Sequence, residues 1–295
     1  MRNASEAGPE TGGSPAEPRD RAAGVPESVP LESWEGCTAA ELRKAWGVTR
    51  IHLFERVGST NDVARILAEN GAPDATVVLA EEQSAGRGRV GRIWASAPGL
   101  GLWLSYVSRP ASPTASGPLP LRVALAVARA LDPWADGNAI SIKWPNDLLL
   151  DGRKVGGILC EGAWEGERLR SVVVGIGLNL LHGPADLPGD LRANATSLRA
   201  ATGQPIARFE VAGAVVKHLR ETLQDTGGSL AHEPDLAARD ALLGRRVRVF
   251  ESEHGAPLLT GRAAGIGADG ALRVDTRDGR QEVRTGTVRL ADSDP

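Results

Sequence analysis

A glycine-rich loop carries the first residues whose types and spacing could do chemistry. The run SAGRGRVGR holds Arg87, Arg89 and Arg92 among glycines, in a chain whose net charge is -3. Glycines leave backbone N–H groups and guanidinium forks free to face an anion. An isolated run of this kind is more often a solvated, flexible loop, but here apolar, strand-like runs flank it and should hold it at a sheet edge. The pattern favours a phosphate or carboxylate site, and it is not a Walker A loop because no GK[ST] follows.

A second run, KWPNDLLLDGRKVGG, combines cations, a carboxylate and adjacent glycines. Lys143, Asn146 and Asp147 surround a turn fixed by proline, and a carboxylate beside a lysine can hold Mg²⁺ near phosphates. Lys154 follows a predicted hairpin turn, where a lone lysine would be explained as an edge residue that discourages aggregation. That explanation does not account for the glycines at 156–157. Their position predicts that a ligand approaches the backbone closely.

Two shorter runs add polar side chains at the ends of elements. In GSTN, Ser59, Thr60 and Asn61 begin a predicted helix. Helix capping explains them in part, and the same hydroxyls and amide form a donor and acceptor set for a small polar group. In GIGLNL, Asn179 ends a buried strand, where it is either a polar ligand contact or a strand-end cap. This run is not a dinucleotide-binding fingerprint, because it lacks a third glycine and a following helix.

Composition and charge exclude several classes of protein. The chain of 295 residues is 41% hydrophobic, which suffices for a core, and its net charge of -3 argues against a general nucleic-acid binder. An RNA- or DNA-binding module that uses the arginine loop is the alternative from a different class. Cys37 and Cys160 share no metal-ligand spacing, and Arg122 and Arg129 interrupt the longest apolar run. We therefore expect a cytoplasmic protein without a membrane span.

The elements that must position these residues alternate between strand and helix patterns. Apolar runs and period-two alternation predict strands over residues 50–57, 75–83, 99–108, 139–144, 148–150, 154–161 and 169–181. Apolar stripes at helical spacing predict helices over residues 37–46, 59–70, 121–131 and 208–224. Thr38, with Glu41 three residues on, predicts a capping box at the start of the first helix, and the run ASPTASGPLP at 111–120 predicts a loop. Several strands follow one another directly, joined by turns such as Asp151-Gly152. This order predicts an α+β fold with a mixed, largely antiparallel sheet flanked by helices.

Composition also divides the chain into three parts. Residues 1–32 are rich in Pro, Gly, Ser, Ala and Glu and cannot bury enough apolar surface to offset their ordering entropy, so we expect a disordered tail. Residues 33–235 contain the motifs and form the main domain. In residues 241–295, valines alternate with arginines between turn signals, which predicts a small appended β-barrel.

In combination the motifs resemble those of one family. GSTN, EEQSAGRGRVGRIW, KWPNDLLLDGRKVGGILCE and VVVGIGLNL, in this order and spacing, are similar to the biotin protein ligases, whose fold is related to lipoate ligases and class II aminoacyl-tRNA synthetases. The resemblance covers roughly residues 50–200, and residues 241–295 match the place of the family's SH3-like domain. It implies a biotin–[biotin carboxyl-carrier protein] ligase. Such an enzyme converts biotin and ATP to biotinyl-5′-AMP and pyrophosphate, then transfers biotin to a lysine of the carrier protein or domain of a biotin-dependent carboxylase.

The resemblance also implies roles for individual residues. Biotin would be held by Ser59, Thr60, Asn61, Gln83, Arg87, Gly88, Arg89 and Lys154. ATP and the adenylate would be held by Arg89, Arg92, Trp94, Lys143, Asn146 and Asn179, with Trp94 as a stacking surface. Mg²⁺ would be held by Asp147. The catalytic group would be Arg89, Lys143, Asp147 and Lys154, and whether Lys143 or Asp147 helps the incoming amine stays open.

Some features depart from the family pattern or leave alternatives. Family members that also repress transcription carry an N-terminal winged helix, whereas this chain has a tail and one helix, so we expect a ligase that does not bind DNA. Val90 occupies a loop position where some relatives have another basic residue. A lipoate or octanoate ligase is the nearest alternative, but the intact GRGRxGR run and the C-terminal β segment favour biotin. A homodimer is an open alternative to a monomer.

Overall fold

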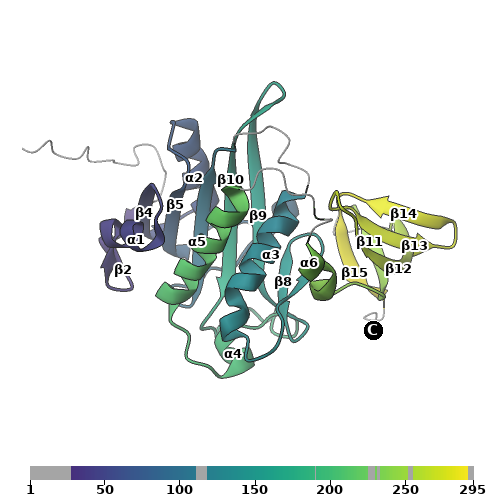
Figure 1. Ribbon diagram of the computed structural model, residues 1–295. Helices are drawn as coiled ribbons and strands as arrows, with labels where there is room; N and C mark the ends of the chain where they lie inside the picture. Colours follow the sequence, from purple (N-terminus) through teal and green to yellow (C-terminus); the bar gives the residue numbers. More distant parts are fainter. Residues whose placement is uncertain are drawn as a thin grey trace, which may run out of the picture.

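Two β-sheets organise the chain. The computed structural model describes residues 28–110, 118–189, 191–224, 230, 233–251 and 255–291 (Figure 1). The large sheet has eight strands in the order β1-β4-β5-β6-β10-β9-β8-β7, and the small sheet has five in the order β14-β13-β12-β11-β15. In the large sheet β4 and β5 run parallel, and the other neighbouring strands are antiparallel. The predicted α+β class with a mixed, largely antiparallel sheet is confirmed.

The elements have the following bounds. The large sheet contains β1 (Val29–Pro30), β4 (Arg50–Val57), β5 (Thr76–Gln83), β6 (Gly101–Ser108), β7 (Ser141–Lys143), β8 (Asp147–Leu150), β9 (Arg153–Glu165) and β10 (Arg168–Asn179). A separate hairpin is formed by β2 (Ser33–Trp34) and β3 (Cys37–Thr38). The small sheet contains β11 (Arg246–Phe250), β12 (Leu259–Ile266), β13 (Leu272–Thr276), β14 (Gly279–Val283) and β15 (Thr287–Leu290). The helices are α1 (Ala39–Trp46), α2 (Thr60–Glu69), α3 (Leu119–Leu131), α4 (Leu198–Thr202), α5 (Arg208–Gln224) and α6 (Pro234–Arg239), with short 3₁₀ turns η1 (Arg89–Gly91) and η2 (Asp132–Trp134).

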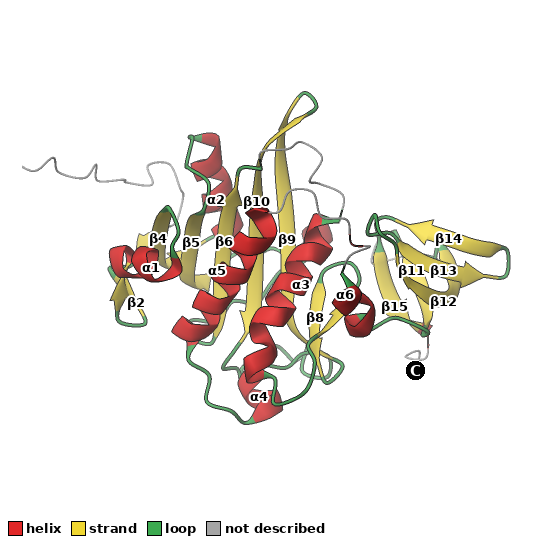
Figure 2. Ribbon diagram, in the orientation of Figure 1, coloured by secondary structure: helices red, strands yellow, loops and turns green. Residues whose placement is uncertain are grey.

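Helices cover the two faces of the large sheet unequally. Helices α3 and α5 lie side by side on one face, where α3 contributes a nearly continuous buried surface to the main core (Figure 2). Helix α2 packs on the other face against β5, β6 and β10, over a smaller core that includes Val63, Ala64 and Val173. The helix start at Thr60 and the ends of the strands beside it therefore lie together on the face that carries the smaller core.

Local sequence signals explain several element ends. Thr38 and Glu41 form the predicted capping box of α1, with the Thr38 hydroxyl accepting from the Glu41 backbone N–H. The β8–β9 turn is at Asp151-Gly152, as predicted, and both residues have a positive φ, of 50° and 73°. Of the loop predicted over residues 111–120, residues 111–117 lie outside the described residues, and α3 begins at Leu119.

The N-terminal boundary differs from the prediction. Residues 1–27 of the predicted tail lie outside the described part of the chain, but Val29 and Pro30 form β1, which pairs with β4. Leu31 N–H continues this contact by donating to the Leu53 carbonyl at 3.0 Å. The tail boundary at residue 32 was therefore set too late, because the pairing of residues 29–31 with β4, a strand later in the chain, is not visible in the local composition.

The small sheet contacts the main body beside β7. The indole Nε1 of Trp144 donates to the Gly270 carbonyl at 2.9 Å, which ties the end of β7 to the turn before β13. Helix α6 also contacts both β7 and β12. Among the helices that the structure describes, none is long and apolar enough to cross a membrane.

Candidate active site

The start of α2 and the neighbouring strands form a polar group, which we call the head cluster and which is buried except for the half-buried Gln83. It consists of Ser59, Thr60, Asn61, Gln83 and Ser105. Thr60 N–H donates to Gln83 Oε1 at 2.9 Å, and the hydroxyl of Thr60 lies 3.1 Å from the same atom. Ser59 is the N-cap residue, yet its side chain makes no capping hydrogen bond. Capping therefore does not account for the Ser59 hydroxyl.

Asn61 uses both atoms of its amide inside the protein. Its Oδ1 lies 2.6 Å from Ser105 Oγ, and its Nδ2 donates to Glu161 Oε2 at 2.7 Å. A Cβ atom on Gly175 would lie 2.1 Å from Asn61 Oδ1, so this amide position requires glycine in β10. The predicted contact of Asn61 with biotin stays a prediction. Sequence reasoning missed Ser105 and Glu161, which become visible only through strand pairing.

The arginine loop is a tight turn that begins at the end of β5. Trp94 N–H donates to the Gly86 carbonyl at 2.8 Å, and Gly88 N–H donates to the Arg92 carbonyl at 2.7 Å. Gln83 Nε2 donates to Ser96 Oγ at 2.7 Å, so the end of the loop is tied to the head cluster. The loop is thus held at both ends, as the flanking strands predicted.

The three arginines of the loop have different partners. Arg87 lies 3.0 Å from an Asp62 oxygen and 2.8 Å from a Glu161 oxygen, so two carboxylates compensate its charge. Arg89 Nη1 approaches Asn146 Oδ1 at 3.5 Å. The structure thus directs Arg87 toward α2 and Arg89 toward the β7–β8 turn.

The third arginine reaches the small sheet. Arg92 Nη2 donates to the hydroxyl of Thr287, the first residue of β15, at 2.9 Å. Nothing in the loop motif pointed to this contact, because the two residues are far apart in the sequence. The small sheet is therefore part of the wall beside the loop.

Lys154, Lys143 and Arg89 lie within electrostatic reach of Asp147, and Arg92 lies within reach of Lys143 and Arg89. We call Arg89, Arg92, Lys143 and Lys154 the cation cluster. Lys154 Nζ lies 2.6 Å from Asp147 Oδ1. Burial lowers the pKa of Lys143; Asp147 opposes this shift, and Lys154, Arg92 and Arg289 add to it. Burial also lowers the pKa of Arg89. Positive charges that depress one another's pKa values create a strong local attraction for anions.

Trp94 lies between the head cluster and the cation cluster. A Cβ atom on Gly177 would lie 2.6 Å from Cε2 of the indole, and one on Gly157 would lie 3.0 Å from Cζ3. Lys154 Nζ lies 5.0 Å from the ring centroid, within cation–π range. Gly157, one of the two glycines that we expected to admit a ligand, thus forms a slot with Gly177, and the indole of Trp94 occupies it. Gly156 faces Leu178 and Leu148 instead.

Asn179 anchors a segment beside Lys154. Its amide Nδ2 donates to the Thr196 carbonyl at 3.0 Å. In the same segment the backbone of Lys154 donates to the Asn194 carbonyl at 2.8 Å and accepts from Thr196 N–H at 2.9 Å. The strand-end interpretation describes this side chain, and its contact with the adenylate stays a prediction.

The donor set for Mg²⁺ is small. The described residues contain no group of three or more His, Cys, Asp or Glu side chains placed to hold a metal ion. Asp147 offers one carboxylate beside the amide of Asn146. An ion that is shared with substrate phosphates needs one or two protein carboxylates, so these residues fit Mg²⁺ in that mode.

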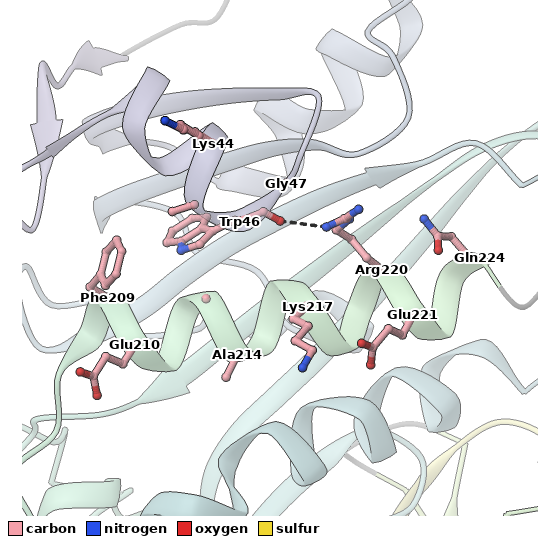
Figure 3. Close-up of a pocket in the computed structure, with 12 residues that line it drawn as sticks. Lys44, Trp46, Gly47, Phe209, Glu210, Ala214, Lys217, Arg220, Glu221 and Gln224 are labelled. Carbon is pink, nitrogen blue, oxygen red and sulfur yellow. Dashed lines mark hydrogen bonds between the residues drawn. The ribbon is translucent and has the colours of Figure 1, made fainter.

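A separate hollow of about 730 Å³ lies between α1 and α5 (Figure 3). Lys44, Trp46, Lys217 and Arg220 are among its lining residues, and Arg220 Nη1 donates across it to the Trp46 carbonyl at 3.0 Å. None of the candidate residues named above lines this hollow. It is therefore not the site that the motifs form.

Comparisons with known proteins agree with this geometry. A model of the Biotin/lipoate A/B protein ligase family matches residues 53–179, and a model of the Biotin protein ligase C terminal domain matches residues 242–290. The bifunctional ligase/repressor BirA of Bacillus subtilis is 36% identical over 239 residues, which are 79% of this chain and 72% of that protein. The biotin--[acetyl-CoA-carboxylase] ligase of Mycobacterium tuberculosis is 32% identical over 248 residues, covering 82% and 89%.

A solved structure shows the same fold. The biotin protein ligase from Aquifex aeolicus in complex with biotin and ATP aligns with a TM-score of 0.70 and 29% identity, over 82% of this chain and 99% of that one. Fold and motifs together define a ligase that activates a carboxylic acid for attachment to protein. The chain belongs to the biotin protein ligase family. The predicted family and the predicted class of enzyme, an ATP-dependent biotin protein ligase, are confirmed.

Proposed function

We propose that the chain forms biotinyl-5′-AMP from biotin and ATP and transfers the biotinyl group to a lysine of a biotin carboxyl carrier protein or domain. One observation carries the proposal. The head cluster and the cation cluster lie on either side of Trp94, so a polar ligand head and an anionic ligand tail both have a place. Biotin has this character, with a ureido ring at one end and a carboxylate at the other.

The first step brings two anions together. The biotin carboxylate must approach the α-phosphate of ATP, and the cations must be in position before the anions meet. Lys154 and Arg89 supply this charge from the β8–β9 hairpin and from the arginine loop, and both surround the same carboxylate, Asp147. The carboxylate oxygen then attacks phosphorus, and pyrophosphate leaves. Arg92 stabilises the negative charge of the phosphates, and Trp94 offers the stacking surface for adenine.

Mg²⁺ would enter with the phosphates of ATP. Asp147, with the amide oxygen of Asn146, would hold the ion, which supplies further neutralisation of phosphate charge. Asp147 contacts Lys154, so the same carboxylate is close to the place where the phosphate charge must be balanced.

In the second step an amine must lose a proton. The lysine amine of the carrier attacks the acyl carbon of the adenylate, and AMP leaves. Lys143 is the better proton acceptor of the two open candidates, because burial lowers its pKa while Asp147 is held by Lys154. Lys143 would therefore take the proton in this step.

Two further expectations and one open question complete the proposal. We expect a cytoplasmic enzyme, and we expect no specific DNA binding, which a gel-shift assay with operator DNA tests directly. Monomer and homodimer are distinguished by light scattering on the purified chain.

The direct test uses purified protein with ATP, Mg²⁺ and a carrier domain, and compares labelled biotin with labelled lipoate. We expect label on the carrier with biotin, and only when ATP is present. Adenylate formation with lipoate alone would overturn the proposal in favour of a lipoate ligase.

A further inference from the structure

We propose that Trp103 is a positioning residue for the nucleotide. It walls one end of the slot over Gly157 and Gly177, which we call the glycine slot, and holds the indole of Trp94 where adenine stacks on it. This role rests on the proposed function and deepens it, because the ligand concerned is ATP. No motif in the sequence pointed to Trp103, which lies within β6. A residue that fixes a binding surface before the ligand arrives lowers the cost of binding.

The register of β6 places Trp103 at the end of the slot. Trp103 lies opposite Gly177 across the β6–β10 pair, and Gly177 lies opposite Gly157 across the β10–β9 pair. Residues directly opposite each other in antiparallel strands direct their side chains to the same face of the sheet. The two glycines therefore form a floor beneath Trp94, and the side chain of Trp103 rises from the next strand as a wall.

One face of the Trp94 indole lies on this floor. Of the ring atoms near a Cβ built on Gly177, Cε2 is the nearest at 2.6 Å, followed by Nε1 at 2.8 Å and Cζ2 at 2.9 Å. Cε2 is bonded to both of the other atoms and lies between them, so an approach in the ring plane would meet Nε1 and Cζ2 first. Gly177 therefore faces the flat side of the ring. The opposite side of the half-buried indole is the one left for a ligand.

Trp103 stands steeply against that flat ring. The two ring centroids are 6.4 Å apart and the ring planes meet at 69°, which is the edge-to-face geometry that aromatic pairs favour. Lys154, from β9, lies 5.0 Å from the centroid of the Trp94 ring. Contacts from three adjacent strands, β6, β10 and β9, thus set the place of the indole.

Trp103 is held more firmly than Trp94. Its indole Nε1 donates to the Glu81 carbonyl at 3.1 Å and to the Ala97 carbonyl at 3.3 Å. It is 1% exposed, and the ring of His182 packs edge-to-face against it at 6.0 Å. Trp94 ends the arginine loop, and among the described residues its indole Nε1 has no hydrogen-bond partner. Trp103 therefore sets the position of Trp94, and not the reverse.

Packing in an apolar core does not account for Trp103. The described residues that make up the main core and the smaller core do not include it, although Leu102 and Val107 of the same strand belong to them. A Cβ on Gly101 would lie 2.3 Å from Cη2 of the Trp103 ring, so this strand needs glycine there to make room for the indole. The indole packs against the slot instead.

Replacing Trp103 should loosen the wall. In Trp103→Met a flexible apolar side chain fills the space without a rigid edge, and in Trp103→Phe a smaller ring leaves a narrower gap. At saturating biotin we expect the KM for ATP to rise about five- to tenfold in Trp103→Met and about threefold in Trp103→Phe, the range of one aromatic pair. The KM for biotin should stay within about twofold of wild type, because the wall positions the surface for adenine and not the head cluster.

A double-mutant cycle with Trp94→Ala tests whether the effect passes through Trp94. Trp94→Ala removes the stacking surface and should itself raise the KM for ATP. In that background Trp103→Met and Trp103→Phe should each change the KM for ATP by less than about 1.5-fold, because the side chain that Trp103 positions is absent. Rises of the same size with and without Trp94, or an unchanged KM for ATP in both single variants, would overturn the role of Trp103. If Trp103→Met does not fold, the cycle with Trp103→Phe decides.

Trp34→Met is the matched control. Trp34 is also 1% exposed and forms an edge-to-face pair, with Trp46 at 6.1 Å, but it belongs to the main core. This variant should lose stability in urea and keep the KM for ATP within about twofold of wild type, and a rise equal to that of Trp103→Met would count against a specific wall. The full-length chain is assayed for biotinyl-5′-AMP formation, with circular dichroism to verify folding. An inactive wild-type chain would contradict the proposed function instead, so the two failures are distinguishable.

Discussion

Replacing Gly177 with alanine should displace the indole that fills the glycine slot. The new Cβ would lie 2.6 Å from Cε2 and 2.8 Å from Nε1 of Trp94, whereas carbon atoms in contact lie about 3.5–4.0 Å apart. The indole must therefore withdraw by about 1 Å. Strand β10 cannot yield, because it is paired with β6 on one side and β9 on the other. Trp94 can, because it follows a loop whose Ile93 side chain is 85% exposed.

The magnitude follows from the overlap. Overpacking of this kind costs about 1–3 kcal/mol, which corresponds to roughly 5- to 150-fold in an equilibrium. Because Trp94 lies between the head cluster and the cation cluster, we expect its displacement to lower the kcat/KM of the enzyme. The kcat/KM for adenylate formation should fall by about tenfold or more in Gly177→Ala. Gly157→Ala should have a smaller effect, since its Cβ would lie 3.0 Å from the indole.

Pyrophosphate release at low ATP and biotin measures the effect, and urea unfolding measures stability. Gly189→Ala is the control, because a Cβ at that position meets nothing within 4 Å. Wild-type kcat/KM in Gly177→Ala, or an equal loss in Gly189→Ala, would refute the role of the slot.

Three further predictions test electrostatics and packing. Lys143→Met should raise Tm by about 2–4 °C at pH 7, because the lowered pKa of Lys143 shows that its charged form is unfavourable in the fold. The gain in Tm should shrink as the pH rises, and an unchanged Tm at pH 7 would contradict this. Burial raises the pKa of Cys160 to about 12. In a Cys37→Ser variant, where Cys160 is the remaining thiol, iodoacetamide at pH 8 should therefore react far more slowly than with a free thiol. Fast labelling, followed by mass spectrometry, would contradict the raised pKa. Arg208 forms an ion pair with Glu81 at 2.8 Å, and Arg208→Met leaves the Glu81 carboxylate without that cation. The free energy of unfolding in urea should fall by about 3 kcal/mol, and a loss below about 1 kcal/mol would show that the pair contributes little.

The sequence sufficed for elements with a strong local signal. The α1 capping box at Thr38 and the β8–β9 turn at Asp151 are set by neighbours a few residues away, and both were predicted. The arginine loop and the Lys143–Lys154 run could also be proposed as anion sites from the sequence, because charge and glycine spacing are local properties, and that role stays a prediction. Strand β1 at Val29 was not predicted, because its formation depends on pairing with β4, which comes later in the chain.

The residues beside the candidate site that the sequence did not reveal are brought there by the register between distant strands. Ser105 reaches Asn61 because β6 and β10 pair so that Ser105 lies opposite Gly175. Glu161 reaches the same amide from β9, 100 residues along the chain. No single-sequence pattern relates such positions, since a shift of one residue would turn each side chain to the other face. The partner of Arg92, Thr287, is even farther away, 195 residues along the chain.

The central claim is that Arg89 and Lys154 supply the charge that lets a carboxylate meet a phosphate. Its most direct measurement is the rate of labelled biotinyl-5′-AMP formation in wild type, Arg89→Ala and Lys154→Ala, with Arg153→Ala as a control on the same hairpin, where the side chain is exposed. We predict that both site variants fold normally and lose most adenylate synthesis, by about 100-fold or more, while the control keeps its rate. Wild-type rates in Arg89→Ala and Lys154→Ala would contradict the account.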